Sequence, residues 1–100
     1  MTIYSVVLAP AAETDISDAF LWYRERNATA ADGFRSEVFQ AIEHIAKSPL
    51  THAADPQAIR RRVLRRFPYT VFYDVTGSIV TILAIAHHRR NPDFWRSRRS

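Results

Sequence analysis

The order of apolar and polar residues divides the chain into a short strand, two helices and three further strands. Residues 3–9 form a β-branched run ending at Pro10, which is typical of a strand followed by the first turn of a helix. Apolar residues then recur at helical spacing over residues 11–27, and this face consists of Ala12, Ile16, Phe20 and Tyr23. The pattern therefore predicts an amphipathic helix directly after the first strand.

A second helical pattern begins a few residues later. Thr29 is positioned to cap this helix with Asp32 in its first turn, and Ser48 and Pro49 end it. Its buried stripe is predicted to consist of Phe34, Val38, Ala41, Ile42 and Ile45. Because few residues separate the two helices, we expect them to form an antiparallel hairpin.

The second half of the chain is typical of extended structure. Residues 49–58 show no periodicity and are expected to form a loop. Strands are predicted at residues 60–67, 69–75 and 79–86. The sequence DVTGS predicts a tight turn between the last two strands, and Pro68 is expected at a turn or on an edge.

The last strand, within SIVTILAIA, is apolar on both faces, which indicates a central strand covered on both sides. The predicted fold class is α+β with the order β-α-α-β-β-β. A mainly antiparallel four-stranded sheet is expected to be covered by the N-terminal helical hairpin. One hundred residues suffice for one core, so we expect residues 1–100 to form a single domain.

Composition limits the class of protein. The chain is 47% hydrophobic and 24% charged, which favours folding over disorder. The sequence contains no Cys, so neither a disulfide framework nor a thiolate metal site is available. No apolar run approaches the roughly 20 residues that cross a bilayer, and the N-terminus lacks a basic region before a long apolar run. We expect a cytoplasmic protein without a membrane partner.

Charge is distributed unevenly along the chain. Residues 1–50 carry a net charge of −3, whereas residues 51–100 carry +7. All basic residues except Lys47 are Arg, whose planar fork suits phosphate and carboxylate groups and stacks on bases. The basic half therefore indicates an anionic partner, either nucleic acid or an acidic protein.

The first candidate site is the basic run IRRRVLRRF. Strand alternation places Arg60, Arg62 and Arg66 on one side and Arg61 with Arg65 on the other. A half-buried strand cannot bury Arg on both faces, so one set is expected to be solvated or bound to an anion. The alternative is an exposed edge strand whose charges prevent association.

The second candidate site is the C-terminal segment AIAHHRRNPDFWRSRRS. If the strand continues, His87 and Arg89 share one side, and the turn at Asn91 could fold Phe94 and Trp95 back beside them. Histidine can exchange a proton at neutral pH, arginine can stabilise charge on a phosphate, and tryptophan can stack a base. In the alternative interpretation, the two aromatic residues only attach the tail to the core.

Other chemistries are disfavoured by the sequence. Adjacent His87 and His88 make poor zinc ligand spacing, so no metal or other cofactor is expected. Gly33 and Gly77 are the only glycines, which excludes a glycine-rich phosphate loop. A nucleophile elbow is absent, and the basic half has too few acidic residues for a paired-carboxylate metal nuclease.

Taken together, these motifs resemble the RelE/ParE superfamily of type II toxin–antitoxin toxins, and within it the ParE-like plasmid stabilization proteins. The likeness covers nearly the whole chain. It rests on RRRVLRRFPYTVFYDV, on VTILAIAHHRRNPDFWRSR and on the helical segments DISDAFLWYRERN and FRSEVFQAIEHIAKSPL. The resemblance implies a growth-inhibiting toxin that a cognate antitoxin silences by wrapping an extended, partly acidic segment over its sheet and basic surface.

The superfamily contains two activities. RelE-like members cut mRNA in the ribosome without metal, through attack of a 2′-hydroxyl on the adjacent phosphate, whereas ParE-like members poison DNA gyrase. The resemblance places Arg89 at the catalytic arginine and Trp95 at a tyrosine that transfers a proton, which an indole cannot do. Arg61 occupies one lysine position of the ribonucleases, but Val63 and Thr70 occupy positions where those members have a lysine and an arginine.

The prediction is therefore a ParE-like gyrase poison, which is expected to form a hetero-oligomer with its cognate antitoxin. Its antitoxin and target surface is predicted to consist of Arg61, Arg65, Arg89, Arg90, Phe94 and Trp95. The first alternative is a RelE-like mRNA endoribonuclease, in which His87 and Arg89 would be catalytic. The second is a non-toxic basic domain that binds nucleic acid or only an antitoxin.

Overall fold

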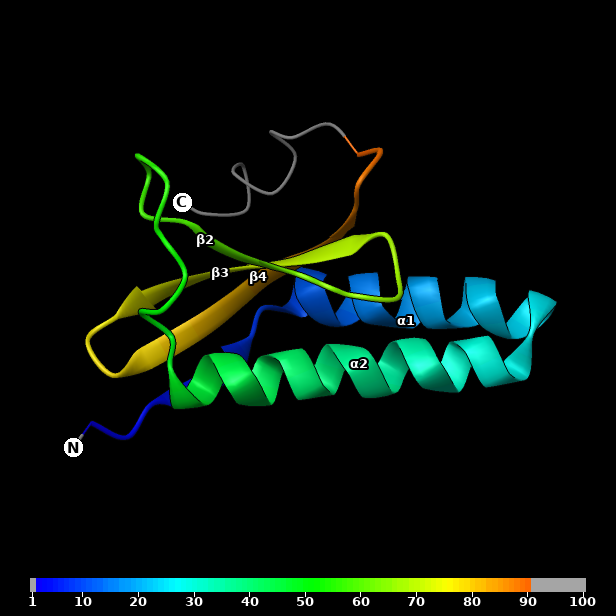
Figure 1. Cartoon of the computed structure of the whole chain (residues 1–100), viewed down its shortest axis with the longest axis horizontal. Helices are drawn as coiled ribbons and strands as arrows, with labels where there is room; N and C mark the ends of the chain where they lie inside the picture. Colours follow the sequence, from blue (N-terminus) through cyan, green and yellow to red (C-terminus); the bar gives the residue numbers. More distant parts are fainter. Residues whose placement is uncertain (1, 91–100) are drawn as a thin grey trace.

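A computed structural model describes residues 2–90 of the chain. The chain forms two helices and a four-stranded sheet. The helices lie side by side on one face of the sheet, as Figure 1 shows. The elements are β1 (Ser5–Leu8), α1 (Pro10–Arg26), α2 (Ala28–Lys47), β2 (Arg60–Val63), β3 (Tyr69–Thr76) and β4 (Ile79–His87). The predicted α+β class and element order are confirmed. No helix within residues 2–90 is long and apolar enough to span a bilayer.

The strands lie in the order β1-β4-β3-β2, so β4 is a central strand as expected. Three of the strands, β2, β3 and β4, are antiparallel neighbours, and only β1 pairs in parallel, with β4. This parallel pair is possible because the helical hairpin supplies the long crossover that returns the chain to the same end of the sheet. β1 is short because Pro10, at the first position of α1, ends it.

The start of α2 differs from the prediction. Asn27, not Thr29, caps this helix: its side chain accepts a hydrogen bond from the Ala30 amide at 3.1 Å. Asn27 has extended dihedrals, so one residue reverses the chain between the helices and Thr29 already lies inside α2. Asp32 consequently falls beyond the first turn. The predicted end of α2 at Ser48 is confirmed.

The core lies between the helices and the sheet. The five predicted stripe residues of α2 are all buried, whereas Phe20 and Tyr23 of α1 are only partly buried. In α1 it is Ala19 that completes the buried face with Ala12 and Ile16. The sheet contributes Val71, Tyr73, Val80, Ile82 and Ile85.

A bulge in β4 changes which of its residues face the helices. Tyr73 pairs with Ile82 and Phe72 pairs with Ala84, so the alternation shifts by one residue at Leu83. Ile82 and Ile85 therefore both join the helix-side core. On the opposite side, which we call the open face, a second cluster contains Ile59, Phe72, Leu83, Ala84 and Ala86.

Strand β2 is shorter than predicted. It ends at Val63, and residues 64–68 form the β2–β3 turn with Pro68 in it, as expected for that proline. Leu64 still donates its amide to the Tyr69 carbonyl at 3.0 Å and is buried in the core. The chain then turns because Glu37 of α2 accepts the amides of Arg65 and Arg66, which removes them from the sheet ladder.

Candidate functional site

Within β2 the basic run is divided between two faces, as the alternation predicted, whereas Arg65 and Arg66 lie in the turn after the strand and are both exposed. Arg62 donates through Nη2 to His44 Nδ1 at 2.9 Å and lies 3.4 Å from His52 Nε2. Arg60 donates to the carbonyl oxygen of His52. Because a guanidinium only donates, the imidazole of His44 accepts through Nδ1. Arg60 and Arg62 therefore fix the segment between α2 and β2 rather than present free charge.

Arg61 lies on the open face. Its guanidinium sits 5.8 Å from the ring centre of Phe72, its partner across the sheet. Arg65 is exposed in the β2–β3 turn. Both residues are thus accessible cations, as the sequence indicated.

Glu37 holds the β2–β3 turn against α2. Its carboxylate accepts the amides of Arg65 and Arg66 and pairs with Arg66 Nε at 3.1 Å. Burial of the side chain favours the protonated form, but the hydrogen bonds and the charge of Arg66 outweigh it, so the pKa of Glu37 is lowered. The carboxylate therefore stays ionised and positions both arginines.

Three aligned positions on the open face contain no charge. Val63 pairs with Thr70, and Thr70 pairs with Ala86, which places these residues in one row across β2, β3 and β4. Thr70 is 6% exposed. Arg61, Phe72 and Ala84 form the neighbouring row.

The structure does not bring His87 to the open face. His87 ends β4 with its ring packed edge-on against Tyr69, 5.1 Å between centres. The strand alternation stops there, because Arg89 donates its amide to His87 Nδ1 and Arg90 donates to the His87 carbonyl, forming a turn. The expectation that His87 and Arg89 share one side of a continuing strand is therefore wrong, and Arg90 lies beside His87 instead. Phe94 and Trp95 lie outside the described residues.

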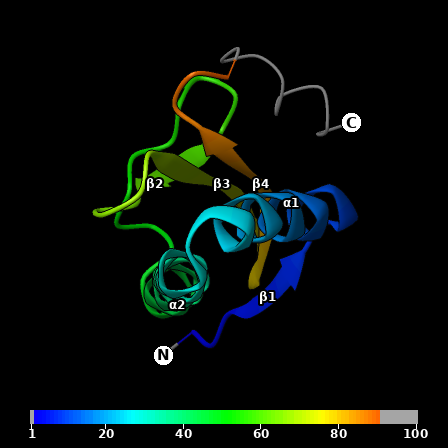
Figure 2. The same cartoon turned by 90° about the vertical axis from the view of Figure 1, so that its right-hand side faces the viewer.

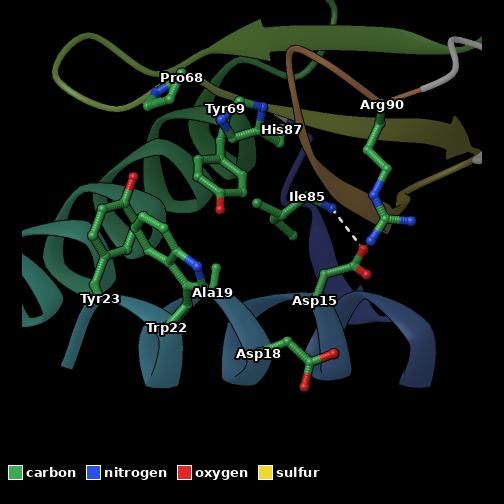
Figure 3. A pocket seen from close by; sticks show the side chains of 10 residues that line it. All are labelled: Asp15, Asp18, Ala19, Trp22, Tyr23, Pro68, Tyr69, Ile85, His87 and Arg90. Carbon is green, nitrogen blue, oxygen red and sulfur yellow. Dashed lines mark hydrogen bonds between the residues drawn. The ribbon is translucent and has the colours of Figure 1, made fainter. Parts of the chain in front are cut away.

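A hollow of about 500 Å³ lies between α1 and the ends of β3 and β4 (Figure 3). We call it the edge hollow. It is lined by Asp15, Asp18, Ala19, Trp22, Tyr23, Pro68, Tyr69, Ile85, His87 and Arg90. It forms because β1 stops at Leu8 while β4 continues to His87, leaving an uncovered sheet edge. Asp15 Oδ2 accepts the Ile85 amide there at 3.0 Å, in the place of a strand partner.

Most of the residues that line the edge hollow were not predicted from the sequence. Asp15, Asp18 and Trp22 follow one another at helical spacing, which was the available signal for a shared face of α1. Their position opposite His87 depends on the early end of β1 and on the turn after β4. Those features follow from packing rather than from local pattern.

An aromatic cluster joins the elements around the edge hollow. The Tyr23 ring lies 5.5 Å from Phe34 and 5.3 Å from Phe67, and Phe34 lies 5.0 Å from Tyr69. Burial raises the pKa of the Tyr69 phenol, with nearby Arg90 acting in the opposite direction. The phenol therefore remains a neutral hydroxyl at neutral pH.

This packing gathers arginines at one end of the molecule, which faces the viewer in Figure 2. The last turn of α1, the β2–β3 turn and the turn after β4 meet there, since Tyr23, Phe67 and Tyr69 are in contact. His88 also donates its amide to the Pro68 carbonyl at 2.9 Å. We call this region the basic end; its exposed arginines are Arg24, Arg26, Arg65, Arg66, Arg89 and Arg90. No cluster of three or more potential metal ligands occurs within residues 2–90.

A helical hairpin on one face of a β1-β4-β3-β2 sheet, with a basic β2 region, is the architecture of a RelE/ParE superfamily toxin. Residues 6–92 match the family model described as the ParE toxin of the type II toxin–antitoxin system parDE, and the chain belongs to this family. The structure is similar to one titled chromosomal ParDE toxin–antitoxin system from P. aeruginosa, with a TM-score of 0.76 and 18% identity. The match covers 85% of this chain and 96% of that chain. No curated protein sequence matches the chain.

Proposed function

We propose that this type II toxin inhibits growth by acting on DNA gyrase, that it does not cut RNA, and that a cognate antitoxin neutralises it. The observation that carries the proposal is the uncharged row on the open face. Val63 and Thr70 stand where the resemblance to the ribonucleases calls for a lysine and an arginine, and Ala86 completes the row.

Cleavage by 2′-hydroxyl attack requires a proton acceptor and cations around one phosphate. On the open face, Arg61 lies beside an apolar row whose one hydroxyl, on Thr70, is almost fully buried. His87, the residue proposed as a substitute base, packs against Tyr69 on the other side of the sheet. Arg61 and His87 therefore lie on opposite sides of the sheet and cannot act on the same phosphate. This supports the gyrase proposal over the ribonuclease alternative.

The purified protein is expected to inhibit gyrase supercoiling of plasmid DNA while leaving mRNA intact in a translating extract. His87→Ala is expected to leave the concentration for half-inhibition of gyrase within about twofold of the wild type, because the His87 ring packs against Tyr69 and is not among the predicted target-contacting side chains. Supercoiling is measured on gels and mRNA ends by primer extension.

Codon-linked mRNA cuts that disappear in both His87→Ala and Arg89→Ala would reverse the assignment in favour of the ribonuclease. Normal growth on induction of soluble protein would instead support the non-toxic basic domain. Arg35→Ala, an exposed arginine on α2 away from the basic end, is the matched control for loss of charge.

The antitoxin is expected to contact the exposed cations Arg61, Arg65, Arg89 and Arg90. Phe94 and Trp95 remain predicted members of this surface. The double variant Arg61→Glu with Arg65→Glu is expected to weaken antitoxin binding at least tenfold, since an acidic segment would meet like charge (about 2–5 kcal/mol for a lost close charge pair). Calorimetry measures the affinity, with Arg35→Glu as the control. An unchanged affinity in the double variant would place the antitoxin elsewhere.

A further inference from the structure

The edge hollow combines aromatic, acidic and basic side chains, of which only Arg90 belongs to the proposed antitoxin and target surface. Its walls include the Trp22 and Tyr69 rings, the Asp18 carboxylate and the Arg90 guanidinium. Trp22 is 51% exposed although it is the largest apolar side chain of α1. The volume of about 500 Å³ falls in the range of ordinary ligand pockets. A solvent-exposed indole beside a hollow of this size is suited to a flat apolar ligand group.

The basic end adjoins the edge hollow, because Arg90 belongs to both. Arg26 stacks on the Trp22 ring with its guanidinium carbon 3.8 Å from the ring centre. In the turn after β4, Arg90 lines the hollow and its neighbour Arg89 is exposed. Arginine binds phosphate through two parallel donors, so the basic end is suited to the backbone of a polyanion.

We propose that the edge hollow and the basic end bind single-stranded nucleic acid, with one unstacked base in the hollow and the adjacent phosphates on the arginines of the basic end. The base would stack on Trp22 and Tyr69. The Asp18 carboxylate can accept a hydrogen bond from an amino group of that base, as acidic side chains do in base recognition. This inference goes beyond the proposed action on gyrase and does not depend on it.

The carboxylate in the edge hollow favours a nucleic acid over an acidic peptide as the ligand. Asp18 lines the edge hollow and is exposed, so its carboxylate would repel the side chains of an acidic segment entering it. A nucleobase is neutral and carries amino donors, while its charge lies on the phosphates outside. Duplex DNA is disfavoured because its bases are stacked and cannot present a face to Trp22.

The test is binding of a fluorescently labelled 12-nucleotide single strand of DNA to the full chain, followed by anisotropy. Trp22→Ala is expected to weaken binding about tenfold, which is the usual effect of removing one stacking aromatic. Phe39→Ala, a 41% exposed aromatic on α2, is expected to leave binding unchanged. In the Trp95→Phe variant, Trp22 is the remaining tryptophan, and its emission is expected to be quenched by the DNA.

Three results would overturn the proposal. One is equal binding of the single strand to the wild type and to Trp22→Ala, with unquenched Trp22 emission. Another is tighter binding of the matching duplex, and the third is equally tight binding of poly-glutamate of the same charge. Circular dichroism of Trp22→Ala verifies that the variant is folded, and gyrase inhibition measured in parallel reports on the other proposal separately.

Discussion

Replacing Phe34 by alanine is expected to lower the free energy of unfolding by about 3–5 kcal/mol, the usual cost of truncating a buried phenylalanine. Phe34 is 0% exposed and contacts the rings of Tyr23, Phe67 and Tyr69. Its removal leaves a cavity where α1, α2, the β2–β3 turn and β3 meet. Since domains of this size are stable by only about 5–15 kcal/mol, a large part of the stability would be lost. Urea unfolding measures the difference.

Phe39→Ala is the matched control, because Phe39 lies on the same helix and is 41% exposed. The gain in helix propensity from alanine is the same in both variants, so the difference between them reports burial alone. We expect Phe39→Ala to cost no more than about 1 kcal/mol. Equal losses in the two variants would show that the aromatic cluster does not join these elements as the structure indicates.

The consequence of Phe34→Ala extends to the basic end. Tyr69 holds His87 in an edge-on contact, and Phe67 anchors the turn that carries Arg65 and Arg66. The arrangement of the arginines of the basic end therefore depends on apolar packing that involves no charge. Loss of this packing is expected to weaken binding of both antitoxin and nucleic acid, even though Phe34 touches neither.

The sequence was a good guide to the elements because each has a strong local pattern. The apolar stripe of α2 predicts a helix, and the tight turn before β4 predicts the β3–β4 hairpin. The apolar character of β4 predicts a central strand. None of these predictions needs tertiary information. The parallel pairing of β1 with β4 was not visible in this way, since no local pattern specifies which edge an N-terminal strand joins.

The details of the site were less predictable, because each depends on contacts between distant segments. The bulge at Leu83 changes which side of β4 each later residue faces, and the turn after His87 ends the strand alternation before Arg89. Asn27 replaces Thr29 as the cap because the chain reverses two residues earlier than the polar pattern suggested. Strand alternation correctly placed Arg60 and Arg62 opposite Arg61 within β2, but the grouping of Arg66 with Arg60 and Arg62 was wrong, because β2 ends at Val63 and both Arg65 and Arg66 are exposed in the following turn.

Replacing Glu37 by glutamine is expected to cost about 1.5–3 kcal/mol at pH 7, the usual contribution of hydrogen bonds to a charged group. The side chain is 12% exposed and accepts the amides of Arg65 and Arg66 besides the Arg66 guanidinium. An uncharged amide oxygen cannot serve all these donors equally well. Thermal or urea unfolding as a function of pH measures the loss.

The pKa of Glu37 determines how the stability difference between the wild type and Glu37→Gln changes with pH. The pKa of Glu37 is lower in the folded protein than its ordinary value of 4.5, so its stabilisation is present above pH 4.5 and is lost as the pH falls through the folded pKa. The wild type and Glu37→Gln are therefore expected to converge in stability at acidic pH. Glu43→Gln, an exposed glutamate on the same helix, controls for loss of one negative charge. If Glu37→Gln and Glu43→Gln follow the same pH profile, the β2–β3 turn is held by its apolar residues Leu64 and Phe67 rather than by the carboxylate.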